Sequence, residues 1–397
     1  MKQSIKHRIK ETHNIEEEKP IYTLIFDMNS VMKMSLSADK RVGTNHLSYG
    51  MVFQTLIQFK KMLGYKNFDY VYGLYDGEQS GILRYKIYEP YKANRDKNYG
   101  ANLTDYDRSM NAFVRKVISY SNEKRKSLKE TENKSYYETD DESFERQRYI
   151  LSVILENLFI RQVICDEVEG DDLIAYYVKN KKPNEKIVIY SGDRDLTQLI
   201  ADDITVYVPQ LKRFITPKNH IDLIGFHYEN VVLKKILCGD SSDNIKGIKS
   251  LGEPTLLKYF PKIKTEKVTL EEVIEGSKLI NEERVKEKKK PLQALSNIVN
   301  AVTDGEQGDK IYEINRKLIS LDEPLLTDSA KEEMDNIMYA PLDPSGRDFK
   351  NIYEIILNEG MSDLLDDKKF ASFFSSFNSI IDMEKKRYNF FEKNLQN

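Results

Sequence analysis

The chain has 397 residues, 40% of them hydrophobic and 31% charged, which is typical of a globular protein with a core of its own. Its formal net charge of −3 excludes the strongly basic balance of many nucleic-acid binders, although basic residues also cluster locally. No apolar run is long enough to cross a bilayer, and the start of the chain lacks the apolar core of a secretory signal, so we expect a cytoplasmic protein without a membrane partner. Two cysteines are too few for a disulfide framework, which leaves metal chemistry to carboxylates.

Strand and helix signals alternate along the first half of the chain. Residues 1–20 are polar and charged, and we expect a mobile tail there. Beyond about residue 231 the strand signals largely disappear, and the rest is predicted to be helical. The alternation predicts an α/β fold with a doubly wound, mainly parallel sheet. The predicted strands are 21–26, 68–75, 159–168, 186–191, 204–208 and 213–215, and the predicted helices between them are 48–64, 105–119, 142–156, 173–178 and 195–200.

Carboxylates recur where the predicted strands end. Because the carboxyl ends of parallel strands converge on one crevice, we expect most of these acids to meet. Asp240 and Asp243 follow another apolar stretch, and their i, i+3 spacing predicts one face of a helical turn. So many acids in one place repel one another unless a cation lies among them, and hard oxygen ligands favour Mg²⁺ or Mn²⁺. The nine acids are Asp27, Asp76, Glu169, Asp171, Asp172, Asp193, Asp195, Asp240 and Asp243.

Each acid alone also has a structural explanation, as a helix cap or a turn residue. Capping needs one acid, however, and residues 169–172 bring three together. The coincidence at several strand ends therefore favours a metal site. Two divalent ions roughly 3.5–4 Å apart can activate water and stabilise the leaving oxygen in attack on a phosphodiester.

The stretch from 81 to about 148 is polar and contains clusters of basic and aromatic residues, including Arg84. Lys92 and Arg95 are spaced to share a helical face and to stabilise phosphate charge, and Tyr91 beside them is an aromatic able to stack on a base. A solvated basic helix is the alternative explanation. The charge run at 286–290 is predicted to be a solvated surface.

Six motifs occur in the following order: Asp27, Asp76, the YKANR at 91–95, the EGDD at 169–172, the SGDRD at 191–195 and the GDSSDNIKGI at 239–248. In this order they resemble the motifs of flap endonucleases and 5′-3′ exonucleases, over about residues 21–260. Residues 311–322 and the helical tail resemble, within that family, the 5′ nucleases of the T-even phage ribonuclease H type.

The resemblance implies a nuclease core at 21–235 and a helical DNA-binding domain at 236–397. Within the core, the region at about 92–148 would form an arch that admits a single-stranded 5′ end. Lys92 and Arg95 would approach the scissile phosphate, and Tyr91 would stack on a terminal base. One metal ion would lie near Asp27, Asp76, Glu169 and Asp171, and a second near Asp193, Asp195, Asp240 and Asp243, with Asp172 in the same network.

The C-terminal part of the resemblance implies a helix–three-turn–helix that binds duplex DNA and commonly holds a K⁺ ion. The sequence departs from the family there, because Glu253 and Pro254 stand where a basic residue is usual. The segment at about 262–310 has the character of an insertion or replacement, so the duplex contact and the K⁺ site stay open. The DNA-binding residues implied by the resemblance are Arg84, Tyr91, Lys92, Arg95, Lys246, Gly247, Lys249 and Gly252.

We expect a Mg²⁺-dependent, structure-specific 5′ nuclease of replication or repair. Its expected substrates are DNA with a 5′ flap, a nick or a single-stranded 5′ end, with RNA–DNA hybrids as a further candidate. A single-strand-binding protein or clamp is a candidate protein partner on the resemblance alone. One alternative is a phosphatase of the haloacid dehalogenase type, although Asn29 stands where that class has a second Asp. The other alternative is a DNA-junction-binding protein without catalysis.

Overall fold

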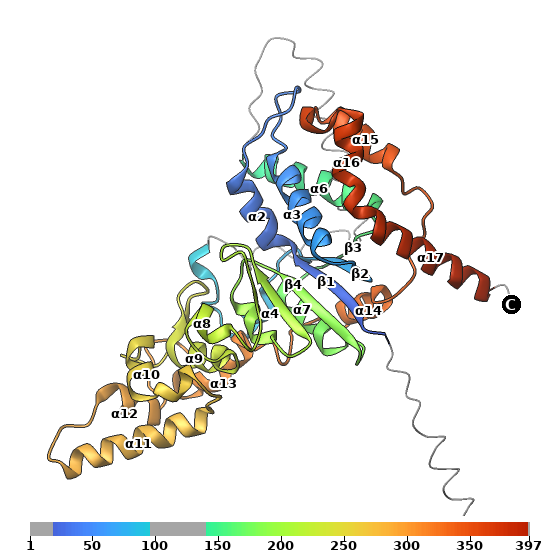
Figure 1. Ribbon diagram of the computed structural model, residues 1–397. Helices are drawn as coiled ribbons and strands as arrows, with labels where there is room; N and C mark the ends of the chain where they lie inside the picture. The colour runs from blue at the N-terminus through green and yellow to red at the C-terminus, as the bar shows by residue number, and fades with distance from the viewer. Residues whose placement is uncertain (1–18, 96–139, 396–397) are drawn as a thin grey trace, which may run out of the picture.

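A six-stranded sheet forms the centre of the computed structural model, which describes residues 19–95 and 140–395 (Figure 1). Its strand order is β3-β2-β1-β4-β5-β6, and every neighbouring pair is parallel except β5 with β6. The predicted doubly wound, mainly parallel α/β fold is confirmed. The strands are β1 (Ile21–Asp27), β2 (Tyr70–Asp76), β3 (Arg161–Cys165), β4 (Glu185–Tyr190), β5 (Ile204–Val208) and β6 (Arg213–Ile215).

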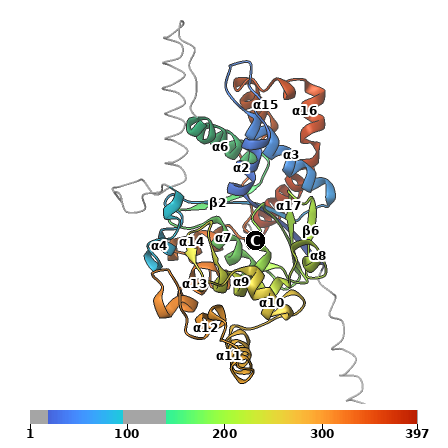
Figure 2. The ribbon, with the colours of Figure 1, turned by 90° about the vertical axis from the view of Figure 1, so that its left-hand side faces the viewer.

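Helices cover both faces of the sheet. Side chains alternate along each strand, and apolar side chains on both faces need helices to bury them. Leu24 and Phe26 of β1 join the core on one face, and Ile25 joins the core on the other. The first face is covered by α2 (Met28–Ala38), α3 (Gly50–Tyr65), α6 (Asp140–Asn157), α15 (Phe349–Asn358), α16 (Asp367–Phe374) and α17 (Asn378–Leu395), and the second by α7 (Gly170–Lys179) and α14 (Asp328–Ile337) (Figures 1 and 2).

The last part of the chain belongs to this core rather than to a separate domain. On α17, Glu384 forms a fully buried ion pair with Arg161 of β3, and Arg387 donates to the backbone oxygen of Asp69 at 2.5 Å. A boundary at residue 236 therefore does not divide the whole C-terminal part from the sheet. In the described part of the chain, no helix has the length and apolar character needed to span a bilayer.

A second group of helices lies at one end of the molecule and surrounds an apolar core of its own (Figure 1). The segment predicted as an insertion or replacement, at about 262–310, supplies two packed helices of this group, α11 (Leu270–Lys286) and α12 (Gln293–Val299). Thr269 and Glu272 form a capping box that starts α11. The elements are α9 (Val231–Cys238), β7 (Gly239–Asp240), β8 (Ile245–Lys246), α10 (Glu253–Tyr259), α11 (Leu270–Lys286), α12 (Gln293–Val299) and α13 (Ile311–Ile319).

Shorter elements lie near the boundary between the sheet core and the second helical group. Three of them carry or flank residues of the site: α4 (Ile82–Ile87) and the 3₁₀ helices η1 (Ala93–Arg95) and η2 (Asp195–Leu199), while α8 (His220–Ile224) precedes the second helical group. The predicted tail and the predicted helix at 105–119 lie outside the described residues, as does the arch region between 96 and 139.

Candidate active site

The candidate site lies at the carboxyl edge of the parallel strands. Asp27 is the last residue of β1, and Asp76 is the last residue of β2. Glu169 directly precedes α7, which follows β3, and Asp193 follows β4. The strand order reverses at β1, because β2 and β3 lie on one side of it and β4 and β5 on the other. In sheets of this kind, ligands bind in the crevice at the carboxyl ends of the two strands where the order reverses, which are β1 and β4 here.

Five of the predicted metal ligands line one small cavity of about 30 Å³. Asp240 and Asp243 reach it from the hairpin formed by β7 and β8, so the predicted helical turn for this pair is wrong. A hairpin turn forms because the Ser242 N–H and hydroxyl both donate to Asp240 Oδ1, at 2.9 and 2.6 Å. The acids that line the cavity are Glu169, Asp171, Asp195, Asp240 and Asp243.

The remaining strand-end acids lie close enough to act on Asp171 electrostatically. Burial raises the pKa of the Asp171 carboxyl well above its usual range, and the charges of Asp27 and Asp193 add to that. Burial also raises the pKa of Asp27 to about 7, against hydrogen bonds from the Ser191 hydroxyl and the Ser30 N–H. Neither Asp27 nor Asp171 forms an ion pair with any described residue. Without a cation beside them, their raised pKa values favour the protonated, neutral form of both groups.

Cationic side chains neutralise other acids of the same pocket. Lys92 forms a hydrogen-bonded ion pair with Glu169, and the Arg84 guanidinium lies 2.8 Å from the other Glu169 oxygen. Burial by itself raises the pKa of Glu169, but these two cations lower it to about 2. From α9, Lys235 binds both Asp195 and Asp240.

The donor set fits a divalent cation in its chemistry, because it is made of hard oxygens and includes two carboxyl groups, Asp27 and Asp171, without an ion-pair partner among the described residues. As the side chains lie, however, no three acidic, imidazole or thiol groups of residues 19–95 and 140–395 meet closely enough to hold an ion. The Lys92 and Lys235 ammonium groups occupy carboxylate oxygens that an ion would share. Metal binding at this site therefore stays a prediction.

Two of the predicted site residues form a structural pair instead. Arg84 is only 4% exposed, donates to the backbone oxygen of Leu318 and holds both oxygens of Asp172, at 2.5 and 3.1 Å. Asp172 also accepts the Leu325 N–H at 2.9 Å. Predicting Arg84 as a DNA contact was wrong, because a buried guanidinium cannot reach a phosphate. We likewise remove Asp172 from the candidate metal ligands, because its oxygens face away into this pair.

Tyr91 is 2% exposed, and its hydroxyl donates to Glu169 at 3.1 Å and to Asp243 at 3.4 Å. The predicted stacking of Tyr91 on a terminal base is not possible while the ring is buried. Lys92 has a φ of 53° and donates its N–H to Asp243, so it precedes η1 and does not share a helical face with Arg95 as predicted. The Arg95 side chain lies outside the described residues.

The predicted duplex-binding residues surround the β7–β8 hairpin. Lys246 and Lys249 are exposed, and Lys249 pairs with Asp304 at 2.6 Å. Gly247 packs so closely that a Cβ would run into the Cys238 carbonyl group. A Cβ at Gly252 would make only an ordinary contact with the Pro254 side chain, and the φ of Gly252 is also ordinary, so this position does not require glycine. A helix–three-turn–helix and its K⁺ ion stay predictions.

Glu253, the acid that stands where the family usually has a basic residue, has an ion-pair partner on a neighbouring helix. Glu253, at the start of α10, forms an ion pair of 2.8 Å with Lys234 of α9. Pro254 stands in the first turn of α10, where a missing N–H costs little. Glu253 therefore joins two helices of the second group.

Two residues of the site were missed in the sequence. Asn29 donates to Asp76 at 2.6 Å and so joins the acids of β1 and β2. Its position two residues after Asp27 was a usable signal. Lys235 had no such signal, because it lies in the apolar helix α9 and meets Asp195 only through the tertiary fold.

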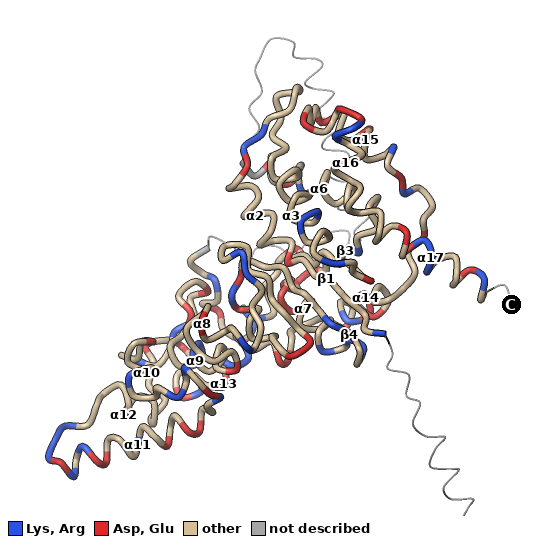
Figure 3. The backbone as a smooth tube through the Cα atoms, in the orientation of Figure 1, with Lys and Arg blue, Asp and Glu red and all other residues tan. Residues whose placement is uncertain are grey.

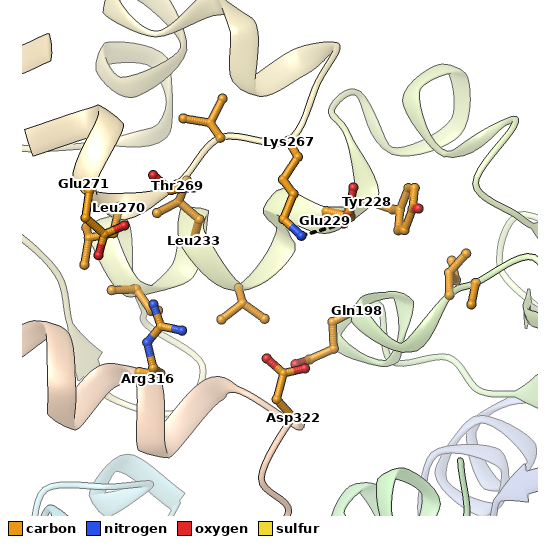
Figure 4. Close-up of a pocket in the computed structure, with 15 residues that line it drawn as sticks. Gln198, Tyr228, Glu229, Leu233, Lys267, Thr269, Leu270, Glu271, Arg316 and Asp322 are labelled. Carbon is orange, nitrogen blue, oxygen red and sulfur yellow. Dashed lines mark hydrogen bonds and ion pairs between the residues drawn. The ribbon is translucent and has the colours of Figure 1, made fainter. Parts of the chain in front are cut away.

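A separate pocket of about 560 Å³ lies between η2, α9, the start of α11 and the end of α13 (Figure 4). Gln198 and Asp322 line one side, and the Lys267–Glu229 ion pair of 2.8 Å lies across from them. None of the predicted metal ligands lines this pocket. It marks an incompletely filled junction between the core and the second helical group.

The family model of the 5′-3′ exonuclease N-terminal, resolvase-like domain matches residues 23–225, which is half of the chain. The chain belongs to the 5′-3′ exonuclease and flap endonuclease family. Within this family, the DNA polymerase I of Bacillus subtilis is 30% identical over 156 residues, covering 38% of this chain and 18% of the polymerase. The 5′-3′ exonuclease of Buchnera aphidicola is 31% identical over 160 residues, covering 38% of this chain and 55% of that protein. The matches thus span less than two thirds of these relatives.

Solved structures of this exonuclease family share the fold. The T5 5′-exonuclease with zinc bound superposes with a TM-score of 0.54 at 15% identity, over 80% of this chain and 98% of that one. The bacteriophage T5 flap endonuclease in a pseudo-enzyme-product complex with DNA and metal ions gives a TM-score of 0.51 at 14% identity, over 86% and 99%. Identities this low show a common fold and no more.

Proposed function

We propose that this exonuclease-family protein is a structure-specific 5′ nuclease that hydrolyses phosphodiesters at 5′ flaps, nicks and single-stranded 5′ ends of DNA. The observation that carries the proposal is the cavity lined by Glu169, Asp171, Asp195, Asp240 and Asp243 at the carboxyl edge of the sheet. DNA as the substrate is supported by family membership and by the DNA bound to the T5 flap endonuclease.

Divalent cations are the second part of the proposal, with Mg²⁺ the expected ion and Mn²⁺ able to substitute. Metal ions bound to the T5 relatives support this. Bound ions would supply an activated water and charge stabilisation at the leaving oxygen. We propose that Asp27, Asp76, Glu169 and Asp171 hold one ion and that Asp193, Asp195, Asp240 and Asp243 hold another.

Lys92 is our candidate for contact with the substrate phosphate. Its ammonium already lies in the acidic pocket on Glu169, and the Lys92 N–H is anchored to Asp243. A phosphate entering beside Glu169 would compete for this ammonium, so we propose that Lys92 neutralises the scissile phosphate. Arg95 is proposed for the same task from family resemblance.

Further partners rest on the resemblance alone. These are RNA–DNA hybrids, a single-strand-binding protein or clamp, and a K⁺ ion. The phosphatase alternative loses its support through the family match. The non-catalytic alternative is weakened because the sequence retains all eight acids proposed as ligands.

The test is cleavage of a 5′-labelled flap with Mg²⁺ by the wild-type protein, Asp171→Asn and the control Asp202→Asn, an exposed acid outside the pocket. We expect Asp171→Asn to lower turnover by at least about 100-fold, the scale of one lost charge-stabilising group. Flap binding in Ca²⁺ should survive in both variants. Unchanged turnover by Asp171→Asn would exclude the mechanism. A panel of flap, nicked duplex, RNA–DNA hybrid and single strand then ranks the substrates.

A further inference from the structure

The far end of the α11–α12 pair carries a concentrated positive charge. Figures 1 and 3 show these helices projecting from the rest of the molecule, with basic residues at the tip. We call residues 286–290 the basic tip; it contains four lysines and one glutamate, and all five residues are exposed. The sequence predicted no more than a solvated surface there.

The charges of the basic tip are largely uncompensated. Lys289 forms an ion pair with Glu287 at 2.8 Å. Lys286, Lys288 and Lys290 form no ion pair with any residue of 19–95 or 140–395. This differs from the lysines of the acidic pocket, which bind carboxylates. The tip therefore presents positive charge to the solvent.

The backbone of the tip supplies a second observation. α11 ends in a Schellman motif, because Lys289 N–H donates to Arg284 O at 2.7 Å and Lys288 N–H donates to Val285 O at 2.9 Å. Lys288 takes the left-handed position of this motif, with a φ of 58°. Glycine is the usual residue there, and an L-residue pays a conformational cost. The motif therefore holds Lys288 at a defined place at the end of the helix.

The other end of the pair adjoins the candidate DNA interface. Asn297 of α12 donates to the backbone oxygen of Lys249 at 2.8 Å, and Lys249 N–H donates to Val302 at 2.8 Å. Exposed Lys246 lies on the hairpin that carries Asp240. Seventeen residues of α11 correspond to a length of about 25 Å. One turn of duplex DNA is about 34 Å long.

We propose that the basic tip binds the phosphate backbone of duplex DNA, at the end of the α11–α12 pair remote from the candidate active site. The proposal rests on the proposed nuclease function and names a distant part of the same substrate. Lysine ammonium groups make phosphate contacts without reading the base sequence. Such contacts release counter-ions, so the tip should make binding steeper in its dependence on salt. An acidic protein surface is the competing occupant.

The test compares flap substrates with a short duplex arm of about 5 base pairs and a long arm of about 20, or half a turn and two turns. Binding in Ca²⁺ is measured for wild type and for the triple variant Lys288→Gln, Lys289→Gln, Lys290→Gln. A matched control replaces Lys350, Lys368 and Lys369 with Gln, three exposed lysines on α15 and α16. We expect the tip variant to bind the long arm about 10-fold more weakly, with a log–log salt slope reduced by about 2–3.

Short-arm binding and short-arm cleavage should be unchanged in the tip variant. Equal affinity for the long arm in variant and wild type would overturn the proposal and leave an acidic protein as the occupant. Equal losses on both arms would overturn it as well, because the tip would then not act at a distance. The proposed nuclease function is tested separately: it would be excluded if the wild-type protein cleaved none of the substrates.

Lys288→Gly separates charge from folding. A tip that serves only the fold should gain thermal stability with no change in DNA binding. A tip that binds DNA should gain stability and bind the long arm about 2- to 3-fold more weakly, as expected when one ammonium no longer neutralises a phosphate.

Discussion

Lysines of the acidic pocket and lysines of the basic tip have the same side chain in opposite surroundings. In the pocket, the side chains of Lys92 and Lys235 are 14% and 19% exposed and bind carboxylates directly. At the tip, Lys288 and Lys290 are exposed and form no ion pair among the described residues. Burial weakens screening by water and salt, so a pocket charge acts strongly on its neighbours. A tip charge acts weakly on the fold and is available to a partner.

This difference separates two kinds of mutational effect. Removing a pocket cation leaves buried carboxylates without a counter-charge, so that they repel one another. The free energy of unfolding, the pKa values of these carboxyl groups and their affinity for a metal ion should then all change. Removing a tip charge without changing the backbone preference, as in a Lys→Gln substitution, should change only binding and its salt dependence. The predictions below test that separation, beginning with the largest expected effect.

Arg84→Met should lower the free energy of unfolding by about 3–5 kcal/mol, because Asp172 and Glu169 would stay buried without their guanidinium. Urea denaturation measures this. Lys86→Met is the control on the same helix, since the exposed Lys86 pairs loosely with Glu167 at 3.6 Å and should cost at most about 0.5 kcal/mol. Similar losses for both variants would mean that burial does not set the strength of the pair.

Lys235→Met should lower the free energy of unfolding in EDTA by about 2–3 kcal/mol, because Asp195 and Asp240 lose a charge-assisted hydrogen-bond donor. Mg²⁺ should then raise the Tm more in this variant than in the wild type, since the freed carboxylates gain a cation. Lys234→Met, whose lysine pairs with Glu253 outside the pocket, is the control. The same Mg²⁺ shift in all three proteins would argue against competition between Lys235 and an ion.

Asp27→Asn should make the metal-free protein more stable at pH 8, by about 1–2 kcal/mol. The pKa of Asp27 is raised from 3.8 to about 7 in the fold, so folding takes up a proton between these values. The stabilising contribution is complete below about pH 4 and is lost as the pH rises through 7. Asparagine removes this loss but also weakens the hydrogen bonds with Ser191 and Ser30. Denaturation in EDTA from pH 4 to 8 should show the free energy of unfolding of the wild type falling below that of Asp27→Asn as the pH rises. Parallel curves for the two proteins would contradict the assigned pKa.

Lys288→Gly should raise the free energy of unfolding by about 0.5 kcal/mol, because glycine adopts the left-handed conformation without strain but frees the unfolded chain. Lys289→Gly is the control and should lower it, since Lys289 has no positive φ. Thermal denaturation compares the two. A loss in both variants would show that the φ of Lys288 carries no cost.

Local patterns were enough for most of the sheet and for the placement of its acids. Apolar runs predicted β5 and β6 at 204–208 and 213–215, where the structure has them. Acids that follow strands had to collect at one edge, because parallel strands all end there. The second helical group was predicted as helical, but the return of α14–α17 to the sheet was not. Contacts such as Glu384 with Arg161 join residues that no local pattern connects.

The sequence by itself determined that negative charge would gather above the sheet, since strand ends and residue types are local properties. Only the tertiary structure decided which cations meet that charge. Arg84 was expected at a phosphate and instead binds Asp172, and Tyr91 was expected under a base and instead donates to Glu169. Lys235 was not noticed and holds two acids. A cation binds the nearest desolvated carboxylate, and which carboxylate is nearest depends on segments far apart in the chain.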